Sequence, residues 1–139
     1  MRINFCNGEM NGWFNVSTLD DLLLVPTNFS EEIVAPNCVH LVKQADLEKL
    51  VKCLFDKLSY GGKLIIGGYD SIELCKIVIR DQIEPAYKHT LIENSQSFLS
   101  LDETVNLLKA AGFIVVSKKL DGLQYTVTCL KSQIVAGAA

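Results

Sequence analysis

The most constraining feature of the sequence is the segment from Asp46 to Ile66, where a helical pattern of apolar residues gives way to a short apolar run. Gly61 and Gly62 are expected to stop the helix, and Lys63–Ile66 then forms a buried strand. A helix that leads directly into a buried strand predicts an α/β fold. The apolar residues of the helical part recur on one face: Leu47, Leu50, Val51, Leu54, Phe55 and Leu58.

Short apolar runs before this segment predict brief strands. Asn-Gly pairs at Asn7 and Asn11 mark turns between the first two runs, and Pro26 and Pro36 end the last two. The expected strands are Arg2–Phe5, Trp13–Val16, Leu22–Val25 and Glu32–Ala35.

Two further helices and a hairpin are predicted after the first helix. Asp70 and Glu73 have the spacing of a capping box, and this helix must end before Pro85. Ser100 and Glu103 repeat the signature, and Gly112 is placed to end the third helix. The strands Phe113–Val116 and Leu123–Leu130 follow, with a turn at Asp121-Gly122. Helices that alternate with strands favour a mostly parallel sheet with a terminal antiparallel hairpin.

The composition fits one globular domain. The chain has 139 residues, of which 49% are hydrophobic, and folding a chain of this length buries about two-thirds of its unfolded surface. These values exclude disorder, and no apolar run approaches the length of a membrane span. The net charge of −3 argues against a nucleic-acid partner, because binding phosphates needs a basic face. We expect one domain over residues 1–131, followed by a frayed tail over 132–139.

The five cysteines indicate a reducing compartment. Their number is odd and none forms a C-x-x-C pair, so neither a disulfide framework nor a zinc site is expected. The start of the chain, Met1–Phe5, lacks the apolar core of a signal peptide. We therefore expect a cytoplasmic protein with free thiols, no bound metal and no membrane attachment.

Two segments of the second half resemble class I S-adenosylmethionine-dependent methyltransferases. The run from His40 to Ile66 is similar to the helix, Gly-Gly turn and fifth strand that follow strand four in that family. The run SFLSLDETVNLLKAAGFIVV is similar to the family's late helix and sixth strand. The final two strands would be the C-terminal hairpin that is the family's topological hallmark. The resemblance implies a Rossmann-like methyltransferase sheet, mostly parallel with a C-terminal antiparallel hairpin and lacking the N-terminal helices.

The N-terminal third resembles a compact branch of the same family. Ile3–Gly8 is similar to a first strand that reads Leu-Asn-Leu-Gly-Cys-Gly, and Gly12–Ser17 is similar to a Gly-Trp-x-Asn-Val-Asp string. Val25-Pro26 resembles the Leu-Pro that follows strand three, and Glu32–Ala35 resembles strand four. Val39–Leu41 is similar to a Glu-His-Leu string with the glutamate replaced.

The resemblance implies S-adenosylmethionine as the cofactor and a small molecule as the methyl acceptor. The methionine part would lie against Asn4–Gly8, the ribose against Ser17, the adenine edge against Val25-Pro26, and the methyl group near Pro36–Val39. No catalytic residue is assigned, because methyl transfer depends mainly on alignment of the acceptor with the methyl group. The implied cofactor-binding residues are Asn4, Phe5, Cys6, Asn7, Gly8, Ser17, Val25, Pro26, Pro36 and Asn37.

Two positions depart from the family's pattern where the cofactor would bind. Cys6 stands at the first glycine position of the loop, and Ser17 stands where a carboxylate would accept both ribose hydroxyls. Asp20 or Asp21 could substitute only if the register slides by several residues. Two functions therefore stay open: a methyltransferase acting on an unknown small acceptor, and a non-catalytic methyltransferase-like domain serving binding or assembly. A generic nucleotide-binding α/β domain is a weaker third.

The connection between the first two strands is short, running only from Cys6 to Gly12. A parallel crossover that contains a helix needs at least about 10–12 residues. The usual helix after the cofactor loop is therefore not expected, and one sheet face near the first two strands should be thinly covered. Because an uncovered apolar face tends to be an interface, we expect a homodimer or an unknown protein partner.

Three further polar residues have two interpretations each. His40 and His89 could act as general bases, but a local hydrogen bond is the commoner role for either. Asp70 follows a strand end, where α/β sheets place ligands. It is also placed to cap the next helix, and the capping role is favoured.

Overall fold

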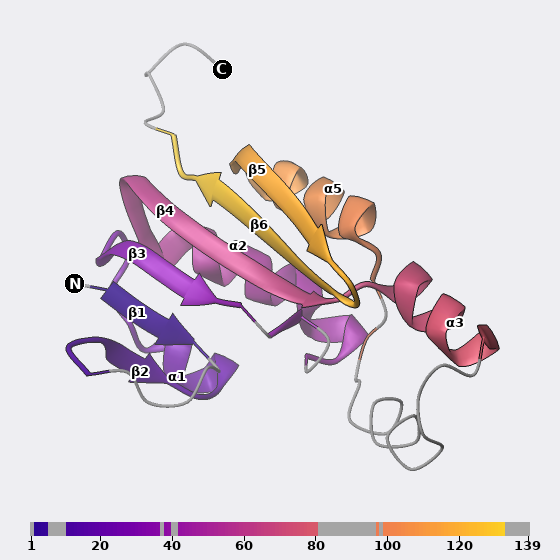
Figure 1. The fold of residues 1–139 in the computed structure, drawn as a ribbon. Helices are drawn as coiled ribbons and strands as arrows, with labels where there is room; N and C mark the ends of the chain where they lie inside the picture. Colours follow the sequence, from indigo (N-terminus) through magenta and orange to yellow (C-terminus); the bar gives the residue numbers. More distant parts are fainter. Residues whose placement is uncertain are drawn as a thin grey trace.

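Within the residues that the computed structural model describes (2–5, 11–36, 38–39, 42–80, 97 and 99–132), the strands form one mixed sheet (Figure 1). Its strand order is β2-β1-β3-β4-β6-β5. The strands are β1 (Arg2–Phe5), β2 (Phe14–Val16), β3 (Ser30–Ala35), β4 (Leu58–Tyr69), β5 (Ile114–Asp121) and β6 (Gln124–Leu130).

The first four strands are parallel and the last two form a hairpin. β1 pairs in parallel with β2 and β3, and β3 pairs in parallel with β4. β6 lies between β4 and β5 and runs antiparallel to both. The hairpin turns at Gly122, whose φ of +62° lies in the left-handed region. The predicted sheet, mostly parallel with a C-terminal antiparallel hairpin, is confirmed.

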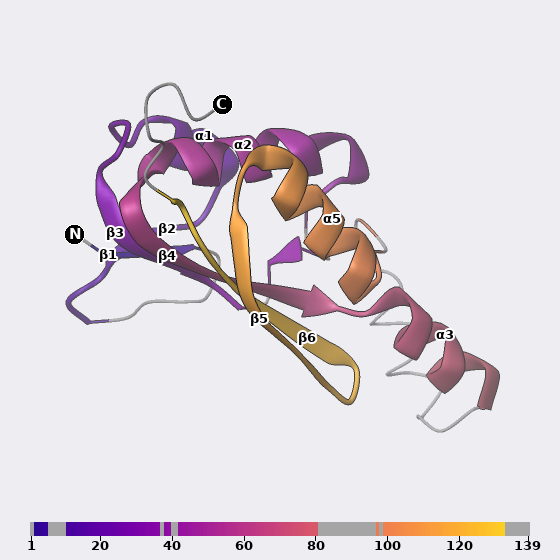
Figure 2. The ribbon, with the colours of Figure 1, turned by 90° about the horizontal axis from the view of Figure 1, so that it is seen from above.

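The helices that pack on the sheet lie on one of its faces (Figure 2). They are α1 (Leu19–Leu23), α2 (Leu47–Lys57) and α5 (Leu101–Ala111), and a 3₁₀ turn, η2 (Gln44–Asp46), leads into α2. α3 (Ser71–Arg80) projects beyond the end of β4. No helix in the described part of the chain is long and apolar enough to cross a membrane.

Crossover handedness explains this one-sided arrangement. The connections from β2 to β3, from β3 to β4 and from β4 to β5 all move across the sheet in the same direction. Right-handed crossovers therefore place α1, α2 and α5 on the same face. The connection from β1 to β2 moves across the sheet in the opposite direction, and a right-handed crossover would place it on the other face of the sheet. At the end of this connection, the Trp13 ring lies 4.9 Å from the Arg2 guanidinium. Among the described residues, that other face has no helix. Residues 6–10 of the short connection lie outside the described residues, so the absence of a helix there stays a prediction.

The core lies between the sheet and this helix layer. Ile3, Ile33 and Leu64 are fully buried at paired positions of three neighbouring strands. They face the fully buried Leu50 and Leu54 of α2, whose helical spacing the sequence had indicated. Burial of such side chains provides most of the stability that holds the helices on the sheet.

Two expectations about secondary structure were wrong. Leu22–Val25 is not a strand: the Thr18 hydroxyl accepts a hydrogen bond from the Asp21 N–H at 3.2 Å and begins the short helix α1. Gly61 and Gly62 do not end α2, which stops at Lys57, before the glycines. Both belong to β4, where the Gly61 N–H donates to the Lys131 carbonyl at 2.7 Å.

The predicted helix caps are confirmed. Ser100 and Glu103 form a reciprocal capping box at the start of α5, and Gly112 ends this helix with a φ of +108°. The Asp70 carboxylate accepts from the Glu73 N–H at 3.0 Å at the start of α3. Residues 133–139, most of the expected tail, lie outside the described residues, so the frayed tail stays a prediction.

Candidate functional site

The carboxyl edge of the parallel strands is the candidate site because the strand order reverses there. β1 is flanked by β2 on one side and β3 on the other. The chain leaves β1 in one direction and later returns on the opposite side, which makes the ends of β1 and β3 a topological switch point. Open α/β sheets bind ligands in the crevice at such a point.

The structure brings several of the predicted site residues to this edge. Asn4 and Phe5 are buried in β1, and the Asn4 amide donates to Asn15 Oδ1 of β2 at 2.9 Å. Ser17 is exposed directly after β2, and Pro36 is half-buried directly after β3. These residues therefore occupy three adjacent strands, as the resemblance implied. Four other predicted residues lie outside the described residues: Cys6, Asn7, Gly8 and Asn37.

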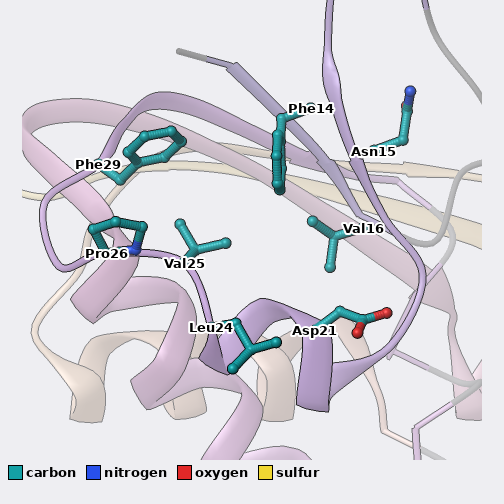
Figure 3. A pocket seen from close by; sticks show the side chains of 8 residues that line it. All are labelled: Phe14, Asn15, Val16, Asp21, Leu24, Val25, Pro26 and Phe29. Atoms are coloured by element: carbon teal, nitrogen blue, oxygen red, sulfur yellow. The ribbon is translucent and has the colours of Figure 1, made fainter.

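Val25 and Pro26 do not lie at the carboxyl edge; they line a pocket beside β2. The chain runs from Ser17 through α1 toward the amino ends of the strands before it reaches them. Just beyond them, the Thr27 hydroxyl donates to Asp56 Oδ2 at 3.1 Å, at the end of α2. Both residues line a pocket of about 370 Å³ beside β2, which we call the edge pocket (Figure 3). Ser17 is not among its lining residues, and the role of Val25 and Pro26 at an adenine stays a prediction.

The edge pocket is mostly apolar. The Phe14 and Phe29 rings meet edge to face with centroids 6.2 Å apart on one side, and Leu24 lies across from them. Val16 and Asp21 connect the pocket to the carboxyl edge, and Asp21 is the one charged group among the described lining residues. The sequence did not indicate this pocket, because it depends on a helix where a strand was expected.

Gly67 lets three strands approach closely at the carboxyl edge. A Cβ atom on this residue would lie 2.5 Å from the Pro36 carbonyl oxygen and closer still to the Tyr125 carbonyl oxygen. The Gly67 carbonyl in turn accepts a hydrogen bond from the Cys38 N–H at 3.0 Å. Gly67 therefore sets the position of the chain that follows β3. Gly67 and Gly68 directly follow the predicted strand Lys63–Ile66, and this pair was the available signal in the sequence.

Asp70 joins this edge to two helices and is not free for a ligand. It is buried, and its second carboxylate oxygen accepts from the Leu101 N–H at 2.8 Å, at the start of α5. Nearby, the Ser97 hydroxyl donates to the Val39 carbonyl at 2.7 Å and ties the segment before α5 to the chain after β3. The predicted capping role of Asp70 is confirmed, and no ligand role is needed.

Two titratable groups of the core, Tyr125 and Cys129, are held in their neutral forms by burial. Burial raises the pKa of the Cys129 thiol to about 12 and also raises the pKa of Tyr125, whose hydroxyl lies 2.8 Å from the Thr104 hydroxyl. Cys53, Cys75 and Cys129 are free thiols. Among the described residues, no cluster of side chains could hold a metal ion. His40 and His89 lie outside those residues.

Comparison with known proteins adds the decisive observation. No protein-family model matches the sequence, and no curated protein is significantly similar to it. Solved structures do match. A S-adenosylmethionine-dependent methyltransferase of Archaeoglobus fulgidus superposes with a TM-score of 0.66 at 11% identity, over 94% of this chain and 86% of its own. The chain has a class I methyltransferase-like fold.

Two further methyltransferase structures agree with this fold. One, from Thermotoga maritima, has a TM-score of 0.64 at 20% identity, over 87% of this chain and 65% of its own. Another, the 1,6-didemethyltoxoflavin-N1-methyltransferase of Burkholderia thailandensis with bound S-adenosylhomocysteine, has a TM-score of 0.57 at 14% identity. This chain spans 88% of its own length but 53% of that enzyme. At such identities the likeness shows the fold and leaves the activity to be argued from the site.

Proposed function

We propose that this chain binds S-adenosylmethionine at its carboxyl edge and transfers the methyl group to a small acceptor. The observation that carries the proposal is the switch point at β1 within a sheet that S-adenosylmethionine-dependent methyltransferases share. The sulfonium of the cofactor supplies the reactive methyl group, so the protein's task is to bind, orient and exclude water.

The described residues fit the parts of such a cofactor. A purine ring needs apolar walls and a hydrogen-bond acceptor at its edge, and the edge pocket offers Phe14, Val16 and Val25 together with the Asp21 carboxylate. Ser17 lies next to Val16 and can bond a ribose hydroxyl. Across β1, Pro36 is held against Gly67 at the place proposed for the methyl group.

A non-catalytic binding domain is the second candidate. Ser17 favours it, because an exposed hydroxyl holds a ribose more weakly than the carboxylate expected there. Cofactor binding without transfer would fit a domain kept for binding or assembly.

Titration calorimetry tests the proposal directly. We expect saturable binding of both S-adenosylmethionine and S-adenosylhomocysteine to the full chain, since the two share the adenosine and amino-acid parts. Absence of heat at millimolar ligand, with circular dichroism showing folded protein, would refute the proposal. Transfer of a labelled methyl group to a panel of small amines, thiols and alcohols then separates the enzyme from the binding domain.

Restoring the carboxylate after β2 should strengthen binding. Ser17→Asp is expected to raise the affinity for both ligands about tenfold, because charge-assisted hydrogen bonds are about twice as strong as neutral ones. Ser17→Asn, which adds the same bulk without charge, is the matched control in the same titrations. Equal affinities of the Asp and Asn variants would show that Ser17 does not face the ribose.

The proposal also covers the compartment in which the protein is found and its association with other proteins. We place the protein in the reducing cytoplasm, and the free buried thiols of Cys53 and Cys129 support this. Association with a second copy or with another protein is also part of the proposal. It is supported by the face of the sheet that no described helix covers.

A further inference from the structure

Both outer strands of the sheet leave one edge without a strand neighbour among the described residues. β2 pairs only with β1, and β5 pairs only with β6. Such edges present backbone N–H and C=O groups that can pair with another strand. The surroundings of the two edges differ in a way that makes them complementary.

The β2 edge is apolar and acidic. Phe14 is 44% exposed, and Leu24, at the far end of α1, is 82% exposed. Asp20 and Asp21 lie in the first turn of α1, next to the carboxyl end of β2, and both are exposed. The carboxyl half of this edge is therefore negative, and its amino half is apolar.

The β5 edge is apolar and basic. Val116 is 58% exposed in the amino half of the strand, and Leu120 is 44% exposed near its carboxyl end. Lys118 and Lys119 are exposed in the carboxyl half, where the exposed Asp121 at the end of the strand leaves the charge of these three residues net positive. Lys118 Nζ lies 3.6 Å from Asp102 Oδ1, a contact between two largely exposed groups that contributes little and can be exchanged.

We propose that the β2 edge of one copy of this chain pairs with the β5 edge of a second copy. β5 runs in the same direction as β1–β4, because two antiparallel steps separate it from β4. A second copy placed beside the first in the same orientation thus adds β5 in parallel to β2 and continues the helix layer on the same face. Lys118 and Lys119 of that copy then lie level with Asp20 and Asp21 at the carboxyl edge.

Charge selects this pairing over the two symmetric ones. Two β2 edges place the aspartates of one copy beside those of the other when paired in parallel, and beside the apolar half of the other edge when paired antiparallel. Two β5 edges bring lysines of the two copies together. Neither symmetric pairing joins opposite charges, and like charges across an interface oppose association. Only the mixed pairing joins opposite charges and also places apolar residues such as Leu24 and Val116 on the same seam. A contact of this kind uses different surfaces on the two copies, so further copies can add at the free edges.

Sedimentation velocity of the full chain without ligand, over a series of protein concentrations, tests the proposal. We expect wild-type protein to self-associate at low ionic strength and to dissociate as salt screens the charges. Lys118→Glu with Lys119→Glu should weaken association at least about tenfold, and so should Asp20→Lys with Asp21→Lys. Mixing the two double variants should restore association, because each then meets an edge of opposite charge.

The control is Lys49→Glu with Lys109→Glu, which makes the same change in net charge on exposed positions of α2 and α5 and should leave association unchanged. Circular dichroism confirms that each variant is folded. Leu24→Ser gives a second test, because this exposed side chain contributes little to the fold and its loss should still weaken association. Monomeric wild-type protein at all concentrations, or association that survives both charge reversals, would overturn the proposal. The β2 edge shares Phe14, Asp21 and Leu24 with the edge pocket. The measurements are therefore made without ligand, so that self-association is tested separately from S-adenosylmethionine binding.

Discussion

Replacing Asp70 with alanine is expected to lower the free energy of unfolding by about 2–4 kcal/mol. One carboxylate caps two helices: its oxygens accept from the Glu73 N–H of α3 at 3.0 Å and from the Leu101 N–H of α5 at 2.8 Å. Loss of a single cap costs about 1 kcal/mol, and a buried N–H left without a partner costs about 1–3 kcal/mol more. Urea unfolding followed by circular dichroism measures the change.

Asp102 provides the matched control for this prediction. It lies in the first turn of α5, as an acidic residue of the same type, but its side chain is largely exposed and its ion pair with Lys118 is at the surface. Asp102→Ala should therefore cost less than about 1 kcal/mol. Asp70→Asn, which keeps one oxygen acceptor, should fall between the two. Equal losses for Asp70→Ala and Asp102→Ala would contradict the double-cap interpretation.

Asp70 also shows which contacts a sequence pattern can predict and which it cannot. Its spacing to Glu73 predicted the cap of α3, because that hydrogen bond lies within one helical turn. The bond to Leu101 could not be predicted, since it joins residues 31 positions apart that meet only once the sheet has formed. Local signals of this kind predicted α2, α5 and the β5–β6 hairpin.

The failures have a physical cause as well. Leu22–Val25 is too short a run for its period to be read, and the Thr18 cap that decides for a helix is a weak signal alone. A Gly-Gly pair fits a helix end and a strand equally, and pairing with Lys131 at the end of β6 decided for the strand. The strand at the Gly-Gly pair thus depended on a contact from a distant part of the chain, and the helix at α1 depended on a single local cap.

The sequence predicted the strand ends of the candidate site but not its pocket. Residues at the ends of β1, β2 and β3 could be placed together, because parallel strands end at one edge of a sheet. The edge pocket could not, since it needs α1 and the return of the chain past Phe29. Sequence patterns thus locate strand ends well, and cavities formed between helices and strands poorly.

Gly67→Ala is expected to destabilise the fold by about 3 kcal/mol, through overpacking of three strands. The added methyl group would clash with two backbone carbonyl oxygens, that of Pro36 directly after β3 and that of Tyr125 in β6. Neither can move without breaking pairs of the sheet, so rotation of a side chain cannot relieve the clash. Urea unfolding measures the loss, with Gly122→Asn as the control. Gly122 has open space around its Cα, and asparagine tolerates its positive φ, so that change should be near neutral.

Ligand binding gives a second readout of the same change. Because Pro36 follows β3 at the proposed cofactor edge, a shift away from Gly67 should weaken S-adenosylhomocysteine binding even at temperatures where the variant stays folded. Asp70→Ala, which loosens the helices without inserting an atom between the strands, should lower stability by a similar amount and weaken binding less. If the two variants lost affinity equally, general destabilisation would explain both results, and Gly67 would have no separate role in positioning the site.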